Sequence, residues 1–214
     1  MILKYSNSTT VNAAETIARG GVIAFRTDTF YGLGADPFNV GALQRIKQLK
    51  GREANKPILV VISDLDPIKR FISERSRTFD RLGKRFWPGA LTLIGAAAKA
   101  VPDEVTAGTG TIGIRLPDDD KVRALVRACG GALTATSANP SGSDPARTAA
   151  EVEAYFGAGV DFIVDSGKSR GDLPSTVVDA GGAETKLIRE GAVPWGEIQA
   201  MLACEKIELQ NRER

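Results

Sequence analysis

The stretch T-D-T-F-Y-G-L-G at residues 27–34 follows an apolar run at residues 22–25 and sets the pattern for the whole chain. The apolar run has the length and composition of a buried strand, and the hydroxyls and glycines after it predict a loop at the edge of a sheet. Loops at strand ends are where α/β proteins bind ligands. Because the same residue types also form tight turns, this stretch alone leaves a structural turn and a binding loop equally open.

Short aliphatic and β-branched runs alternate with segments of helical period along the rest of the chain, which is typical of α/β folds. Further strands are predicted over residues 58–62, 91–94, 111–116, 132–136, 162–164, 176–179 and 186–188. Helices are predicted over residues 39–50, 76–86, 119–129 and 148–156. No repeat or Pro-rich linker divides these elements, so we expect one domain over residues 1–193 and a partly helical tail over residues 194–214.

The composition indicates a folded globular protein, because 43% of the 214 residues are hydrophobic and 25% are charged. Lys and Arg total 28 against 26 for Asp and Glu, so any anion binding is expected to be local. The chain has no histidine, which excludes Ser-His-Asp and Cys-His nucleophiles and imidazole metal sites. Catalysis is therefore expected to use Lys, Arg, hydroxyl, carboxylate and backbone groups.

The two cysteines, Cys129 and Cys204, stand far apart and form no C-x-x-C pair. Neither a disulfide framework nor a zinc site is indicated, and a reducing cytoplasm suits both thiols. Residues 1–10 mix polar and apolar side chains, unlike a signal peptide, and no segment is apolar enough to cross a bilayer. We expect a cytoplasmic protein without a membrane partner.

Two glycine motifs resemble nucleotide-binding signatures but stand in the wrong context. Gly108, Gly110 and Gly113 match G-x-G-x-x-G, yet a strand is predicted where that motif needs the start of a helix. The segment at residues 167–169 resembles the end of a P-loop, but Phe162 stands where the first glycine is required. It also begins a G-x-S-x-G match that lacks a histidine partner, so we interpret it as a flexible loop.

Basic residues gather in two places. Lys50, Arg52 and Lys56 follow the first predicted helix, which Gly51 can terminate. Arginine presents a planar fork to phosphate oxygens and lysine a mobile point charge, so this triple suits a polyphosphate, although basic helix ends are common. The second run, at residues 69–85, is interpreted as a solvated helix face in preference to a binding patch.

Polar residues at two further strands are candidates for ligand binding. Ser137 and Asn139 leave the strand predicted at residues 132–136, and small groups of this kind let backbone N–H groups approach a nucleotide. A simple Asx or Ser turn is the better explanation of that motif on its own. Arg115 lies inside an apolar strand and needs an anionic partner, which a structural salt bridge or a substrate carboxylate could supply.

Five motifs occur in a fixed order: T-D-T-x-Y-G-L at residues 27–33, K-x-R with a following Lys-Pro at 50–57, S-A-N-x-S-G at 137–142, S-T-V-V-D at 175–179 and I-R-E-G at 188–191. In this order they resemble the threonylcarbamoyl-AMP synthase (YrdC-like) family, and five separated motifs are far more specific than any one of them. The resemblance implies an α/β fold with a twisted mixed sheet and flanking helices around a concave basic cavity.

The resemblance also implies an activity and a distribution of roles. The activity is nucleotidyl transfer that makes L-threonylcarbamoyladenylate from L-threonine, bicarbonate and ATP with release of pyrophosphate, for threonylcarbamoyladenosine modification of tRNA. Lys50 and Arg52 would be catalytic, and the ATP side would hold Arg52, Lys56, Thr111, Ser137, Asn139 and Arg189. The threonine side would hold Thr29, Tyr31, Ser175 and Arg115, with Arg115 pairing with the substrate carboxylate.

Several further expectations follow from the resemblance. Mg²⁺ is expected to arrive on the ATP, because no carboxylates are spaced as a metal cage. Many relatives carry a histidine where this chain has Val61, which removes a side-chain contact that threonine could make there. The product is expected to pass to a separate tRNA threonylcarbamoyl transferase machinery, and tRNA itself is an open candidate partner.

Two other functions stay open. One is an RNA-binding module without turnover, although aromatic residues are only 6% of the chain and do not interleave with the basic ones. The other is a carbamoyl-adenylate-forming domain used in metalloenzyme maturation. Domains of that kind normally belong to longer chains with zinc-finger and acylphosphatase segments, which this sequence does not contain.

Overall fold

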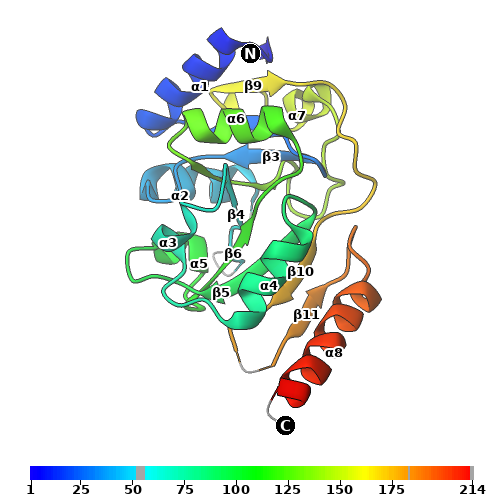
Figure 1. The fold of residues 1–214 in the computed structure, drawn as a ribbon. Coiled ribbons are helices and arrows are strands. Elements are labelled where there is room, and N and C mark those ends of the chain that lie inside the picture. The colour runs from blue at the N-terminus through cyan, green and yellow to red at the C-terminus, as the bar shows by residue number, and fades with distance from the viewer. Residues whose placement is uncertain (52–55, 183, 213–214) are drawn as a thin grey trace.

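The protein is described by a computed structural model over residues 1–51, 56–182 and 184–212, and its strands form two sheets flanked by helices (Figure 1). The five-stranded sheet has the order β1 (Ile2–Lys4), β9 (Phe162–Asp165), β2 (Ile23–Arg26), β3 (Tyr31–Gly34) and β8 (Thr136–Ser137). The six-stranded sheet has the order β11 (Lys186–Arg189), β10 (Thr176–Asp179), β5 (Leu91–Ala96), β6 (Thr111–Arg115), β4 (Val60–Ile62) and β7 (Ala132–Thr134). The predicted mixed α/β fold is confirmed, with its strands divided between two sheets.

The four predicted helices are present as α2 (Val40–Leu49), α4 (Arg77–Phe86), α6 (Asp120–Ala128) and α7 (Ala149–Phe156). Each begins after a side chain that accepts a backbone N–H, and these caps are Asn39, Ser76, Asp119 and Thr148. Helix α2 ends at Lys50, and Gly51 follows with a φ of 56°, as the sequence predicted. The other helices are α1 (Asn7–Ala18), α3 (Ile68–Phe71), α5 (Asp103–Thr106), the 3-10 turn Gly157–Gly159 and α8 (Trp195–Arg212).

The second half of the opening motif is a strand, where a loop was expected. Residues 31–34 form β3, which pairs with β2 in an antiparallel hairpin, and Thr27 N donates to Phe30 O across the turn at 2.9 Å. All four residues of β3 are buried, so the sequence lacks the alternation of polar and apolar side chains that would predict a strand. Gly34 is needed there because an added Cβ would lie 2.6 Å from the Phe25 ring.

One short segment, residues 132–137, joins the two sheets. Its first part is β7, which pairs with β4, and its second part is β8, which pairs with β3. The larger hydrophobic core cluster accordingly contains buried residues of both sheets, among them Leu33 and Ile114. The two sheets therefore meet where this segment crosses from one to the other.

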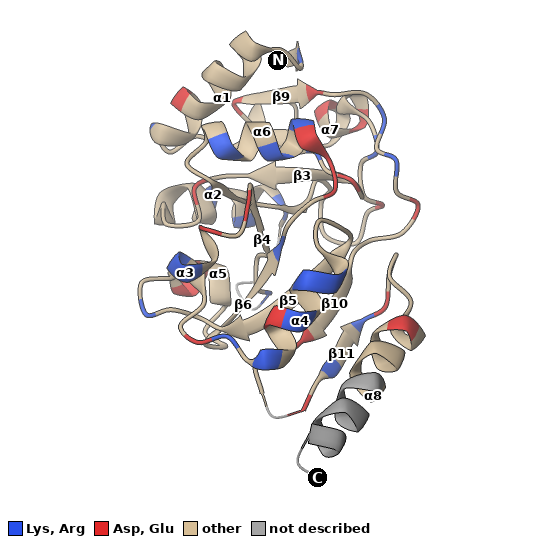
Figure 2. Ribbon diagram, in the orientation of Figure 1, with Lys and Arg blue, Asp and Glu red and all other residues tan. Residues whose placement is uncertain are grey.

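The second basic run lies on α3 and α4, where Figure 2 shows Lys and Arg along the helices. Helix α4 buries Phe79, Leu82 and Gly83, and its N-cap Ser76 donates its hydroxyl to Ala180 O at 2.6 Å. The apolar side of α4 therefore packs on the protein, and its basic residues lie on the remaining face. No helix in the described part of the chain is both long and apolar enough to span a membrane.

Candidate active site

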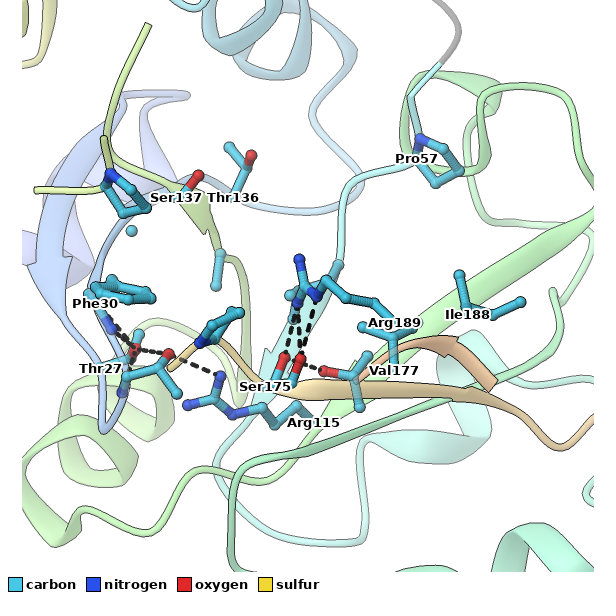
Figure 3. Close-up of a pocket in the computed structure, with 18 of the residues that line it drawn as sticks. Thr27, Phe30, Pro57, Arg115, Thr136, Ser137, Ser175, Val177, Ile188 and Arg189 are labelled. Carbon is cyan, nitrogen blue, oxygen red and sulfur yellow. Dashed lines mark hydrogen bonds between the residues drawn. The ribbon is translucent and has the colours of Figure 1, made fainter. Parts of the chain in front are cut away.

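A cavity of about 570 Å³ opens between the two sheets (Figure 3). The five-stranded sheet contributes the β2–β3 turn, the start of β3 and both residues of β8. The six-stranded sheet contributes residues of β5, β6, β10 and β11. The polar or charged side chains around it are Thr27, Thr29, Tyr31, Thr92, Thr111, Arg115, Thr136, Ser137, Ser175 and Arg189. Since this lining holds two arginines, many hydroxyls and no carboxylate among the described residues, it suits a small anionic ligand.

Arg115 occupies the floor of this cavity at the end of β6 and is only 3% exposed. One guanidinium nitrogen forms an ion pair with Asp28, and another donates to Thr29 Oγ1 at 3.1 Å. Its Nε is buried without a hydrogen-bond partner. The structure therefore supplies the salt bridge that the sequence required, and it still leaves one donor of Arg115 unsatisfied.

Electrostatics around the two arginines favour an added anion. Burial, and then the positive charge of Arg189, lowers the pKa of Arg115 to about 9. Partial loss of solvent also lowers the pKa of Arg189, which lies at the end of β11. An anion bound beside these guanidinium groups would stabilise their charged forms and raise both pKa values.

Arg189 is tied to Ser175, as Figure 3 shows. Its guanidinium donates to Ser175 O at 2.9 Å and to Ser175 Oγ at 3.3 Å. Ser175 is 2% exposed, and its hydroxyl lies 2.9 Å from that of Thr92. The I-R-E-G and S-T-V-V-D motifs therefore meet here, and Gly191 permits it, because an added Cβ would lie 2.2 Å from Pro174 O.

Lys50 has a different setting from the one expected of a phosphate ligand. It is 5% exposed, does not line the cavity, and its ammonium donates to Ser137 O at 2.5 Å and to Asn139 O at 2.8 Å. In return, Ser141 N donates to Lys50 O at 2.9 Å. The lysine therefore ties the S-A-N-x-S-G loop to the end of α2.

Of the other residues predicted to bind the nucleotide, some line the cavity and some do not. Ser137 and Thr111 line the cavity, whereas Asn139 and the exposed Lys56 do not. Asn139 is 7% exposed, donates its amide to Pro140 O and Ser143 O, and keeps its Oδ1 buried without a partner. Arg52 lies outside the described residues. The described lining thus carries the charge of two arginines, and a strongly basic cavity stays a prediction.

Tyr31 lines the cavity, but its hydroxyl is held elsewhere. The residue is fully buried, and its hydroxyl donates to Gly167 O at 2.8 Å and lies 3.4 Å from Asp165 Oδ1. Burial, followed by the negative charge of Asp165, raises the pKa of Tyr31 to about 12, which keeps the hydroxyl protonated as a donor. The side chain thus fastens β3 to the connection between β9 and β10.

The sequence did not select Thr27 and Thr136, which line the cavity, or two further residues of the site. Thr92 is a single hydroxyl residue inside an apolar strand, and Asp28 lies between the two threonines of T-D-T. Their significance depends on partners more than 80 positions away in the chain. The only local signal was that each is polar within, or directly beside, a buried segment.

Comparison with known proteins identifies the family of this chain. A family model named Sua5_yciO_yrdC and described as telomere recombination matches residues 15–191. A threonylcarbamoyl-AMP synthase of Thiobacillus denitrificans is 40% identical over 173 residues, which cover 81% of this chain and 90% of the relative. The family resemblance stated from the motifs is therefore confirmed.

Solved structures give the same result. The Pyrococcus abyssi Sua5 structure in complex with L-threonine matches with a TM-score of 0.90 and 32% identity over 94% of this chain, which spans 60% of that protein. The Escherichia coli YciO structure matches with a TM-score of 0.80 and 27% identity, covering 91% of this chain and 96% of that one. By sequence and by structure, the chain belongs to the Sua5/YciO/YrdC family.

Proposed function

We propose that this protein makes L-threonylcarbamoyladenylate from L-threonine, bicarbonate and ATP, with release of pyrophosphate, for tRNA modification. The observation that carries the proposal is a cavity where Thr29, Ser175 and Arg189, from three of the five motifs, converge with Arg115 of β6. The chain is also 40% identical to a threonylcarbamoyl-AMP synthase. The homologous P. abyssi protein crystallised with L-threonine supports the amino acid as one substrate.

The Arg115 end of the cavity is the proposed threonine side. Arg115 would receive the substrate carboxylate, because its Nε is buried without a partner and its charge is destabilised by burial. Thr29 and Ser175 border the same end and offer hydroxyl groups. Val61 is fully buried and does not line the cavity, so threonine would be held here without a contact from that position.

The nucleotide is proposed to lie toward Ser137, Thr111 and Arg189. Ser137 and Thr111 line the cavity from different sheets, and Arg189 supplies a cation between them and the threonine side. Lys50 would act by holding the backbone of Ser137 and Asn139, which would bring the loop's N–H groups and hydroxyls to the ATP. Arg52 and Lys56 remain proposed phosphate ligands.

The proposed reaction needs no protein nucleophile. The threonine amine would attack the carbon of bicarbonate and water would leave, which forms a carbamate; a carbamate oxygen would then attack the α-phosphorus and release pyrophosphate. Negative charge builds on the phosphoryl oxygens and the leaving group, where cations and hydroxyl donors in a partly closed cavity are most effective. The protein's contribution is therefore positioning and electrostatic stabilisation.

Mg²⁺ is proposed to enter bound to ATP. No group of three or more acidic or cysteine side chains in the described residues could hold a metal ion, and the described lining of the cavity has no carboxylate. This donor set fits a cation that keeps its phosphate and water ligands. When bound, Mg²⁺ would neutralise phosphate charge, while Arg189 and the hydroxyls orient the substrate around it.

The test is an omission series on the purified protein. ATP, Mg²⁺, bicarbonate and threonine are supplied together and then each is left out, and pyrophosphate and the mixed anhydride are both measured. Dependence on all four supports the proposal, and pyrophosphate release that is indifferent to threonine defeats it. Replacing threonine and bicarbonate with carbamoyl phosphate tests the maturation-domain alternative. Salt-sensitive RNA binding without any turnover would favour the RNA-binding module.

The product is proposed to pass to a separate threonylcarbamoyl transferase machinery that acts on tRNA. A mixed anhydride of this kind is labile in water, so prompt transfer is an advantage. We place the reaction in the cytoplasm, where ATP and tRNA are both available.

A further inference from the structure

A chain of hydrogen bonds inside the cavity ends on a residue that none of the five motifs contains. The guanidinium of Arg189 donates to Ser175 Oγ at 3.3 Å, and Ser175 Oγ lies 2.9 Å from Thr92 Oγ1. Thr92 belongs to β5, is 1% exposed and lines the cavity. Its hydroxyl therefore lies at the inner end of a polar chain that reaches from the rim of the cavity to its wall.

The position of the Thr92 side chain is set by its neighbours. Strand β5 lies between β10 and β6, and Thr92 is paired with Val177, two residues after Ser175. On the other side, Gly113 of β6 leaves room for the Thr92 methyl group, because a Cβ at Gly113 would lie 3.1 Å from Thr92 Cγ2. A β-branched side chain has few rotamers, so placing the methyl over Gly113 turns the hydroxyl toward Ser175.

The number of protons in this chain limits what the two hydroxyls can do. Arg189 only donates, so it occupies one lone pair of Ser175 Oγ. If Ser175 donates to Thr92, its single proton is used and Ser175 offers the cavity no donor. If Thr92 donates to Ser175, both lone pairs of Ser175 are occupied and its O–H is free to point at a ligand. An anionic ligand can accept a hydrogen bond from Ser175 only in the second arrangement, because in the first the free O–H belongs to Thr92.

We propose that Thr92 is a positioning residue for the amino-acid substrate: by donating to Ser175 Oγ, it directs the Ser175 O–H at an anionic oxygen of bound threonine. This inference rests on the proposed function and deepens it. The described lining of the cavity provides two arginines and no carboxylate, so the ligand that fits there is an acceptor. In the arrangement proposed here, Ser175 is the donor to that ligand, and its two lone pairs accept from Arg189 and Thr92. Thr92 acts through Ser175 and does not itself need to touch the substrate.

The experiment is a steady-state comparison of Thr92→Val with Thr92→Ser and with wild type, measuring pyrophosphate release while threonine and ATP are varied separately. Thr92→Val keeps the shape of the side chain and removes the donor, so the KM for threonine should rise about 5-fold, as expected for one hydrogen bond. The KM for ATP should stay within twofold of wild type. Thr92→Ser keeps the hydroxyl and should restore most of the threonine affinity.

A double-mutant cycle separates positioning from direct contact. On a Ser175→Ala background, Thr92→Val should have no further effect on the KM for threonine, because the group that it orients is gone. Thr134→Val is the matched control, since Thr134 is a fully buried sheet hydroxyl that hydrogen-bonds Ala35 N and Leu33 O and does not line the cavity. That control should change thermal stability and leave the threonine KM unchanged.

Three outcomes would overturn the inference: an unchanged KM for threonine in Thr92→Val, an equal rise in both KM values, or effects of Thr92→Val and Ser175→Ala that simply add. Binding of L-threonine measured by calorimetry gives a second reading that does not depend on turnover, and it should weaken by the same factor. If wild-type protein forms no threonylcarbamoyladenylate at all, the proposed function fails before the variants are compared.

Discussion

The wall of the cavity formed by Arg115, Ser175 and Arg189 differs in kind from the loop that Lys50 holds. On the wall, charged and hydroxyl side chains face a common space and keep unsatisfied or destabilised donors. At the loop, the buried ammonium of Lys50 is already bonded to two backbone carbonyls, those of Ser137 and Asn139. Residues that the sequence selects on similar grounds can thus line the cavity or hold the loop beside it.

The distinction matters because both groups look alike in the sequence. A lysine or arginine beside glycine and hydroxyl residues suggests a ligand in either case. Access to the cavity separates them: Arg115 and Arg189 line it, whereas the ammonium of Lys50 is buried away from it and bonded to two main-chain oxygens. The four predictions below test this separation, beginning with the largest expected effect.

Arg115→Ala should have the largest effect on both activity and stability. Product formation should fall on the order of 10² to 10³-fold, as when a single transition-state donor is removed. The substitution also leaves Asp28 without its buried partner, which should lower the free energy of unfolding by about 3 kcal/mol. Pyrophosphate release and thermal melting check the two effects.

A matched control for Arg115 is Arg75→Ala, which breaks an exposed ion pair with Asp80 on the surface. That change should leave activity at the wild-type level and shift stability by at most about 1 kcal/mol. Arg115→Lys should recover little activity, because an ammonium group cannot bond Asp28, Thr29 and a carboxylate with the geometry of a guanidinium. A fully active lysine variant would contradict the role given to the arginine.

Lys50→Ala should come second. The main-chain oxygens of Ser137 and Asn139 lose their charged donor. Product formation should therefore fall about 10- to 100-fold, which corresponds to the free energy of one charge-assisted hydrogen bond. Because the loop is displaced, the KM for ATP should rise and protease cleavage near Ser141 should accelerate. Lys47→Ala, on the same helix, is the control. A loss of activity with unchanged proteolysis would instead favour direct contact between Lys50 and phosphate.

Tyr31→Phe should have a smaller effect. Gly167 O loses its donor, and stability should fall by about 1 kcal/mol. Trypsin should then cut faster after the exposed Lys168 and Arg170, which follow Gly167 in the connection between β9 and β10. Tyr155→Phe serves as the control, since that ring is 38% exposed on α7. Equal cleavage rates in both variants would show that the hydroxyl does not fasten this connection.

The double substitution Arg77→Ala and Lys84→Ala should have the smallest effect. Both side chains are exposed on α4, outside the described cavity, so turnover should be unchanged and stability should shift by no more than about 0.5 kcal/mol. Binding of tRNA, measured at two salt concentrations, tests whether the basic face of α4 binds RNA. A marked loss of salt-dependent binding would identify α4 as an RNA surface.

Much of the fold could be predicted because local signals are strong where helices begin and end. The helices predicted from Asn39, Ser76, Asp119 and Thr148 are all present, and the side chain of each of these residues caps its helix. Helix α1 was missed because its sequence, N-S-T-T-V-N-A-A-E-T-I-A, carries little apolar periodicity and buries only Thr9, Ala13 and Ile17. The division into two sheets depends on long-range pairing that no local pattern encodes.

The candidate site could be predicted only in part as a set of residues, and not as a geometry. Thr29, Arg115, Ser175 and Arg189 line one cavity, whereas Lys50, Lys56 and Asn139 do not. The partners of Lys50 and Tyr31 could not be foreseen, because each bonds a main-chain oxygen, and every residue offers one. Thr92 was missed because a threonine in a strand is ordinary until its hydroxyl is known to meet another.

The crossing of residues 132–137 from one sheet to the other also governs how ligands affect the whole domain. Since Ala135 and Ser137 border the cavity at this junction, a molecule that touches both walls acts as a staple across the two sheets. Neither sheet can then melt without releasing it. A ligand bound at this junction should therefore protect both sheets together, and the melting temperature should rise with the ratio of its concentration to its Kd.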